Sequence, residues 1–116
     1  MSSEKIDLSY LLTVGGDDME FVREMLDMFL NSAPIEVNNI STHFASGDYQ
    51  AMASAAHKIK APIQMMGEHE MADIIIQIET IGKNNEGIAE LPNLIAKLKI
   101  ELEKVIVKIN DLDTQM

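Results

Sequence analysis

The residue types best suited to chemistry lie together on one predicted helix, with a histidine at the centre of the group. Lys58 follows His57 directly, and Lys60 follows it after three positions. At about 100° per residue, Lys60 lies one turn on from His57, whereas Lys58 lies on its flank. An exposed histidine offers a neutral ring nitrogen as a nucleophile, and a lysine one turn away can meet an incoming phosphate group. Most exposed helical histidines are ordinary surface residues, so this geometry alone assigns no role.

The periodicity around His57 indicates which side of its helix is buried. Apolar side chains recur at helical spacing and share one face: Met52, Ala55, Ala56, Ile59, Ile63 and Met66. Roughly the opposite face carries His57, Lys60, Ala61 and Gln64. The helix is therefore amphipathic, and His57 is expected on its exposed side.

The chain lacks the residues of several common sites. His43 and His69 have no comparable setting: His43 is expected to be a surface residue, and His69 lies at a helix start, where the dipole suits its acidic neighbours better than a histidine. The absence of cysteine excludes disulfides, thiolate chemistry and zinc–thiolate sites. No histidine has a glutamate three positions before it, as a di-iron bundle needs, and no phosphate-cradling Gly-Lys-Ser/Thr sequence occurs. We therefore expect this chain to bind no cofactor or metal ion itself.

The composition is that of one acidic globular domain. The 116 residues carry a formal net charge of -10, and 47% of them are hydrophobic. An acidic surface repels nucleic-acid phosphates and anionic lipids, so neither is an expected partner. The N-terminus has no apolar signal-peptide run, and the apolar stretch Met71–Ile78 is too short to span a bilayer. These features predict a soluble, cytoplasmic, single domain over residues 1–116.

The N-terminal part of the chain shows helical signals and no strand alternation. A short helix is predicted over Asp7–Val14, and Asp17 or Asp18 then caps a long helix. The apolar stripe of this long helix consists of Phe21, Val22, Met25, Leu26, Met28, Phe29 and Leu30. Pro34 removes a backbone donor and predicts a kink or break near Ala33. Beyond it, the inward positions are Val37, Ile40, Phe44 and Ala45.

The rest of the chain continues as helices. Asp48 is a good cap for a helix from Tyr49 to about Met66, and a further helix runs from about Glu68 to Ile81. Residues 82–87 have loop composition. A last helix starts near Pro92 and reaches about Asp111. Four long helices with short connections predict an all-α, antiparallel four-helix bundle with a short extra N-terminal helix.

The sequence Ala56-His57-Lys58-Ile59-Lys60 resembles the signature of histidine phosphotransfer (HPt) domains. In that signature, the phosphorylatable histidine is followed by a variable residue, an aliphatic residue and a lysine. Gly67 matches a small residue that the family has ten positions after the histidine. Three upstream segments are also similar to the family: Gly15–Val22, Phe29–Pro34 and Gly47-Asp48. The resemblance spans about residues 8–83.

The resemblance implies a phosphoryl carrier without autonomous catalysis. His57 would accept the phosphoryl group from a phospho-aspartyl receiver, or from a hybrid sensor histidine kinase acting through one. It would then pass the group to the receiver domain of a response regulator, and the receiver would supply Mg²⁺. The carrier is expected to act as a monomer.

The resemblance also implies roles for residues around His57. Lys60, supported by Lys58 or Lys83, would offset the phosphoryl charge. Glu79 or Gln64 would hydrogen-bond the imidazole or the phosphoryl group. The alternative for Glu79 and Lys83, which are four residues apart, is an ordinary surface ion pair.

Four residues are expected to contact the receiver by the same resemblance: Leu11, Val14, Ala61 and Gly67. The family usually has glycine four residues after the histidine, where this chain has Ala61 followed by Pro62. Because Pro62 cannot donate to the carbonyl of Lys58, we expect a local bend that alters the fine geometry of docking.

Two other functions remain open from the sequence. One is a non-catalytic helical adaptor that binds a partner through its acidic surface. The other is a degenerate HPt domain that only binds receivers.

Overall fold

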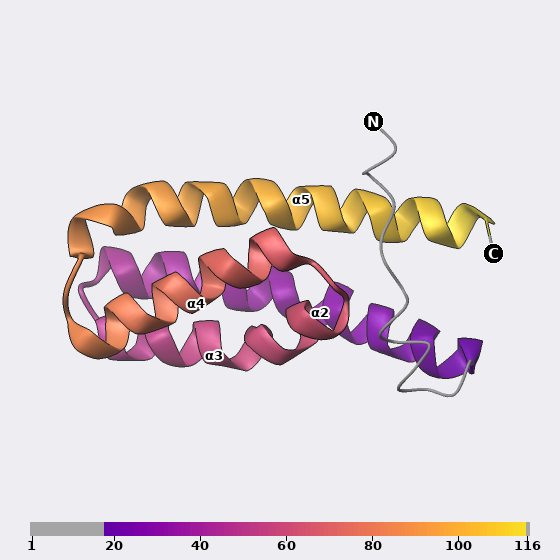
Figure 1. The fold of residues 1–116 in the computed structure, drawn as a ribbon, viewed down its shortest axis with the longest axis horizontal. Helices are drawn as coiled ribbons and strands as arrows, with labels where there is room; N and C mark the ends of the chain where they lie inside the picture. Colours follow the sequence, from indigo (N-terminus) through magenta and orange to yellow (C-terminus); the bar gives the residue numbers. More distant parts are fainter. Residues whose placement is uncertain (1–17, 116) are drawn as a thin grey trace.

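The computed structural model describes residues 18–115. These residues form four long helices and one short 3-10 helix: α2 (Met19–Ala45), α3 (Tyr49–Met65), α4 (His69–Asn84), η2 (Ile88–Glu90) and α5 (Leu91–Gln115). The short helix predicted over Asp7–Val14 lies outside the described residues. Figure 1 shows the four helices lying along the length of a bundle, each running back against the one before it. The predicted antiparallel four-helix bundle is therefore confirmed.

None of the described helices is both long and apolar enough to cross a membrane.

Helix α2 begins at the predicted cap and continues through Pro34. The Asp18 carboxylate accepts hydrogen bonds from the backbone N–H groups of Glu20 at 2.9 Å and Phe21 at 3.4 Å. A break near Ala33 was a wrong prediction, because α2 is helical from Met19 to Ala45. Proline in a helix interior costs about 3 kcal/mol. Burial of apolar side chains on both sides of Pro34 offsets that cost; they include Phe29, Ala33 and Val37.

The inner face predicted for α2 includes two residues that are exposed in the structure. Met28 is 62% exposed, and Ala45 is exposed at the C-terminal end. Met28 lies about 100° around the helix from the buried Phe29, outside the arc that packs on the other helices.

Helix α3 follows its prediction closely. The Asp48 carboxylate caps it by accepting from the Ala51 N–H at 3.1 Å, and the helix runs through Pro62 to Met65. All six side chains expected on its inner face are buried: Met52, Ala55, Ala56, Ile59, Ile63 and Met66.

Helix α4 extends three residues past its predicted end and includes Gly82 and Lys83, which the composition assigned to a loop. The helix ends where Asn85 adopts a left-handed conformation, with φ 57°. Gly82 is buried against α3, where an added Cβ would lie 2.7 Å from the Tyr49 carbonyl oxygen and 2.9 Å from the Ala53 Cβ. This glycine therefore permits close packing of two helices and does not mark a turn.

The C-terminal helix closes the bundle. Its predicted inner side chains are buried or half-buried: Leu94, Ile95, Leu98, Leu102, Val105, Ile106 and Ile109. The Lys108 ammonium lies 3.2 Å from the Glu68 carboxylate, and both side chains are largely shielded from solvent. This ion pair ties the connection between α3 and α4 to α5.

Candidate functional site

Glu79 of α4 is the centre of a cluster of charged side chains. It is the only polar or charged residue that is buried among the described residues, with 4% of its surface exposed. Its Oε2 lies 2.8 Å from Nδ1 of His57 and 3.0 Å from Nζ of Lys83. Its Oε1 lies 2.9 Å from Nζ of Lys60. Glu79 is thus no ordinary surface partner of Lys83, because one buried carboxylate joins three cationic or titratable side chains.

Two neighbouring helices position this cluster. Helix α3 places His57 and Lys60 one turn apart, and α4 places Glu79 and Lys83 one turn apart. The helices approach closely because Gly82 faces the small, buried Ala53. A short carboxylate side chain on α4 can consequently reach the imidazole on α3.

Glu79 is ionised in this environment. Burial by itself would raise the pKa of its carboxyl group, but three hydrogen bonds outweigh burial. They come from Lys60, Lys83 and His57, and the charge of Lys60 adds a further attraction, so that the pKa of Glu79 is lowered to about 2. At neutral pH the carboxylate can therefore only accept hydrogen bonds.

The ionised carboxylate decides which nitrogen of His57 carries the proton. Because Glu79 can only accept, the contact at 2.8 Å requires an N–H at Nδ1. In the neutral ring, Nε2 then has a free lone pair. The His57 side chain is 65% exposed, so a partner protein can approach it from solvent.

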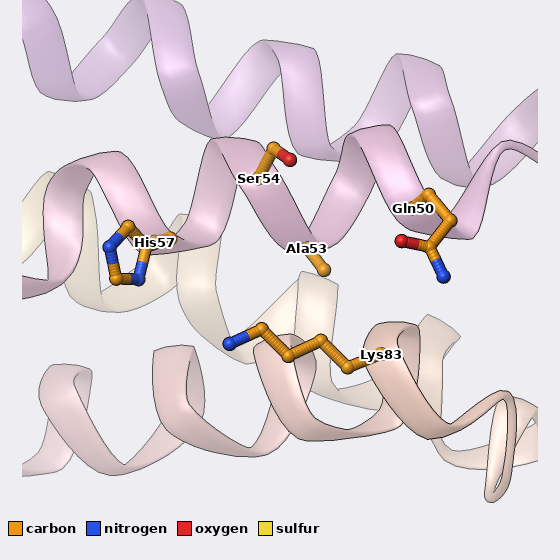
Figure 2. A pocket seen from close by; sticks show the side chains of 5 residues that line it. All are labelled: Gln50, Ala53, Ser54, His57 and Lys83. Atoms are coloured by element: carbon orange, nitrogen blue, oxygen red, sulfur yellow. The ribbon is translucent and has the colours of Figure 1, made fainter.

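A shallow hollow of about 270 Å³ lies beside His57, between α3 and α4. Its lining residues are shown in Figure 2: Gln50, Ala53, Ser54, His57 and Lys83. The figure shows the Lys83 side chain extending along α4 with its amine pointing toward His57. The sequence reasoning missed Gln50 and Ser54, although their spacing of seven and three residues from His57 puts them on the same face of α3.

The remaining site residues expected from the sequence are not part of the Glu79 cluster. Lys58 is exposed on the flank of His57, and Ala61 is exposed one turn beyond it. Gln64 is exposed on α3 about 10.5 Å along the helix from His57, and no hydrogen bond joins it to Glu79. Leu11 and Val14 lie outside the described residues.

Gly67 has a local structural role. It lies in the connection between α3 and α4 with φ 72°, and its N–H donates to the Gln64 carbonyl oxygen at 3.0 Å. This left-handed conformation after the end of a helix favours glycine, so the backbone alone explains the residue at this position. A bulky residue at this position would strain the turn whether or not a receiver docks there.

Within residues 18–115, no group of three or more His, Asp or Glu side chains is arranged to hold a metal ion.

Comparison with known proteins agrees with this geometry. The Hpt domain model matches residues 24–107. The structure is similar to a crystal structure of the HPT domain from a sensor hybrid histidine kinase of Shewanella, with a TM-score of 0.83 and 26% sequence identity over 97% of each chain. Curated protein sequences give no significant match. Since the domain model covers well over half of the chain, this protein belongs to the Hpt domain family and is a phosphotransfer carrier of two-component phosphorelays.

Proposed function

We propose that His57 carries the phosphoryl group and that its Nε2 atom is the nucleophile. The observation that carries this proposal is the bond of 2.8 Å between Nδ1 of the exposed His57 and the buried carboxylate of Glu79. It fixes the ring orientation and leaves the lone pair of Nε2 for the attack.

In the proposed transfer one bond forms, one bond breaks and no proton moves. The Nε2 lone pair attacks the phosphorus of an aspartyl phosphate on a receiver domain, and the bond between phosphorus and the aspartate oxygen breaks. The electron pair returns to the aspartate, which becomes a carboxylate. The ring keeps its Nδ1 proton and becomes a phosphorylated imidazolium, whose positive charge lies against Glu79. In the onward step, the aspartate of a second receiver attacks the phosphorus, and the electrons of the N–P bond return to Nε2.

The two lysines of the cluster support charge on the transferring group. Lys60 is mostly covered and bonded to Oε1 of Glu79, so its amine is held near the ring. Lys83 is more exposed and lines the hollow beside His57, so its amine can turn from Glu79 toward a phosphoryl group on Nε2. Phosphoryl transfer depends chiefly on positioning and charge stabilisation, which these side chains supply. Exposed Lys58 contributes charge from the flank.

The partner completes the reaction. Hpt domains work with receiver domains and histidine kinases. We propose that the receiver provides Mg²⁺ and most of the catalysis, and that this chain has no autonomous activity. One copy of the chain supplies all four side chains of the cluster, so a monomer suffices.

The test is phosphorylation by a purified receiver domain that has been charged with acetyl phosphate. Intact mass measured in non-acidic solution should show one phosphoryl group on the wild type, and this group should be lost in acid. His57→Gln should remain unlabelled with an unchanged helical circular dichroism spectrum. His69→Gln, at an exposed histidine, is the matched control and should be labelled fully. Full labelling of His57→Gln would overturn the proposal.

A further inference from the structure

The hollow between α3 and α4 offers polar groups that the bundle itself does not use. Neither the side-chain amide of Gln50 nor the hydroxyl of Ser54 forms a hydrogen bond with another residue in the described range 18–115. Serine within a helix commonly bonds to a carbonyl of the preceding turn, as Ser32 does with the Met28 carbonyl oxygen at 2.8 Å. The side chains of Gln50 and Ser54 are therefore available to a ligand.

Lys83 supplies the positive charge of the hollow. Its amine bonds to Oε2 of Glu79 at 3.0 Å, and its side chain is 61% exposed. An ammonium group has three N–H donors, so this contact leaves two of them for a further acceptor. No acidic side chain is among the described residues that line the hollow. An anion that enters it consequently meets a cation and no lining carboxylate.

The hollow has the size of a small organic molecule. Its volume is about 270 Å³, just below the range of about 300–1,000 Å³ that is typical of pockets for drug-sized ligands. The methyl group of Ala53 lines it between Gln50 and Lys83 (Figure 2). This apolar patch between polar groups suits a short ligand that has a carbon atom between two polar ends.

The hollow lies beside the imidazole but away from its nucleophilic nitrogen. Figure 2 shows one ring nitrogen of His57 directed toward α4 and the other directed away from Gln50 and Ser54. Because Nδ1 bonds to Glu79 of α4, the nitrogen that points away is Nε2. A ligand in the hollow thus leaves Nε2 open to a receiver domain.

We infer that the hollow binds a small carboxylate with a second polar group, of the 2-hydroxy acid class, and that this ligand slows phosphoryl transfer by engaging Lys83. The inference rests on the proposed function of His57. The carboxylate accepts from the Lys83 amine, and the hydroxyl bonds to Gln50 or Ser54. A monoanion fits better than a phosphate dianion, because the ionised carboxylate of Glu79 is close to the same amine and repels additional negative charge.

The ligand should reduce the transfer rate without stopping it. Lys83 offsets charge on the transferring group, and a bound carboxylate removes that contribution by occupying the amine. Since Nε2 stays open, attack on the receiver's aspartyl phosphate continues. The rate at saturating ligand should therefore fall a few-fold and reach a floor equal to the rate of Lys83→Ala.

The binding experiment titrates the complete chain with sodium lactate and follows its two-dimensional ¹H–¹⁵N NMR spectrum. The side-chain amide signal of Gln50 should shift and saturate with a Kd of about 1–10 mM, as expected for one charge-assisted bond and one or two neutral ones in an open site. Acetate, which has no hydroxyl group, should bind roughly threefold more weakly. Sodium chloride at the same ionic strength should produce no saturating shift.

Variants assign the binding to the hollow. Lys83→Ala should abolish the saturating shift. Ser54→Ala should weaken lactate binding a few-fold and leave phosphorylation without lactate unchanged. Gln77→Ala, at an exposed position of α4 outside the hollow, is the control and should bind lactate as the wild type does. Lactate shifts that match those of chloride, or that persist in Lys83→Ala, would overturn the inference.

The transfer experiment separates this inference from the proposed function. Time courses with a charged receiver should slow a few-fold in lactate for the wild type and stay unchanged for Lys83→Ala. Equal slowing of both proteins would place the effect on the receiver and overturn the inference, even if His57 is phosphorylated. If lactate binds in the hollow but His57 takes no phosphoryl group from any receiver, the binding site stands and the proposed function fails.

Discussion

The imidazole of His57 and the carboxylate of Glu79 are joined across two helices by a contact of 2.8 Å, although 22 residues separate them in the chain. Because Glu79 is buried and ionised, the contact holds a negative charge behind the ring on the side opposite to its free nitrogen. Positive charge that develops on the ring during phosphoryl transfer is thereby stabilised.

Replacement of Glu79 by glutamine should slow onward transfer. The amide can still accept from Nδ1 but carries no charge, so the positive charge of the phosphorylated ring is no longer offset. Transfer to a receiver should be about tenfold slower in Glu79→Gln than in the wild type.

Rapid-quench measurements of phosphohistidine decay, with the receiver in excess, follow this change. Glu70→Gln, in the exposed first turn of the same helix, is the control. Equal decay rates for Glu79→Gln and the wild type would show that the charge of Glu79 does not act on the ring.

Glu79 should also contribute to stability in a pH-dependent way. Its pKa is about 2 in the folded protein, against 4.5 for the unperturbed group. A lowered folded-state pKa gives a stabilisation that is fully present above about pH 4.5 and is lost as the pH falls toward 2. The loss should be on the order of 3 kcal/mol in the free energy of unfolding.

Urea unfolding of the wild type and Glu79→Gln between pH 7 and pH 2.5 checks this prediction. The difference in stability between the two proteins should shrink as the pH falls. A constant difference over that range would contradict the lowered pKa of Glu79.

The three lysines near His57 should differ in their effects on transfer. Lys60→Ala should slow phosphorylation of His57 about tenfold, because this amine is held in the cluster by Glu79 at 2.9 Å. Lys83→Ala should have a smaller effect, of a few-fold, since its side chain is largely exposed. Lys58→Ala should have the smallest effect, because this exposed neighbour of His57 acts only from the flank. Time courses of phosphorylation by one receiver domain compare the three variants. Equal effects of Lys58→Ala and Lys60→Ala would show that Lys60 has no special role in transfer.

Gly82→Ala should separate α3 from α4. The new Cβ would meet the Tyr49 carbonyl oxygen at 2.7 Å, and backbone cannot yield as a flexible side chain does. We expect a loss of about 1–3 kcal/mol in stability and slower transfer, because α4 also carries Glu79. Thr80→Ala, at an exposed position of α4, should change stability by less than about 0.5 kcal/mol. A Gly82→Ala protein with wild-type unfolding and transfer would contradict the close packing.

Local sequence signals predicted much of the fold because they act within a few residues. Asp18 and Asp48 cap helices where their short carboxylates can reach the next backbone N–H groups. The apolar spacing of α3 identified its buried side and, by exclusion, the exposure of His57. Proline and glycine were less informative, since packing overrides local preference. Pro34 lies within a continuous helix, and Gly82 is a contact between helices.

The sequence by itself determined an acidic all-α bundle with an exposed histidine and a lysine one turn away, because helical periodicity fixes which side chains share a face. It left Glu79 and Lys83 equally compatible with a surface ion pair. Only the tertiary structure decided that the Glu79 carboxylate is buried, ionised and bonded to His57. That arrangement depends on how closely α4 approaches α3. The distance between two helices is set by their packing, and no local sequence pattern reveals it.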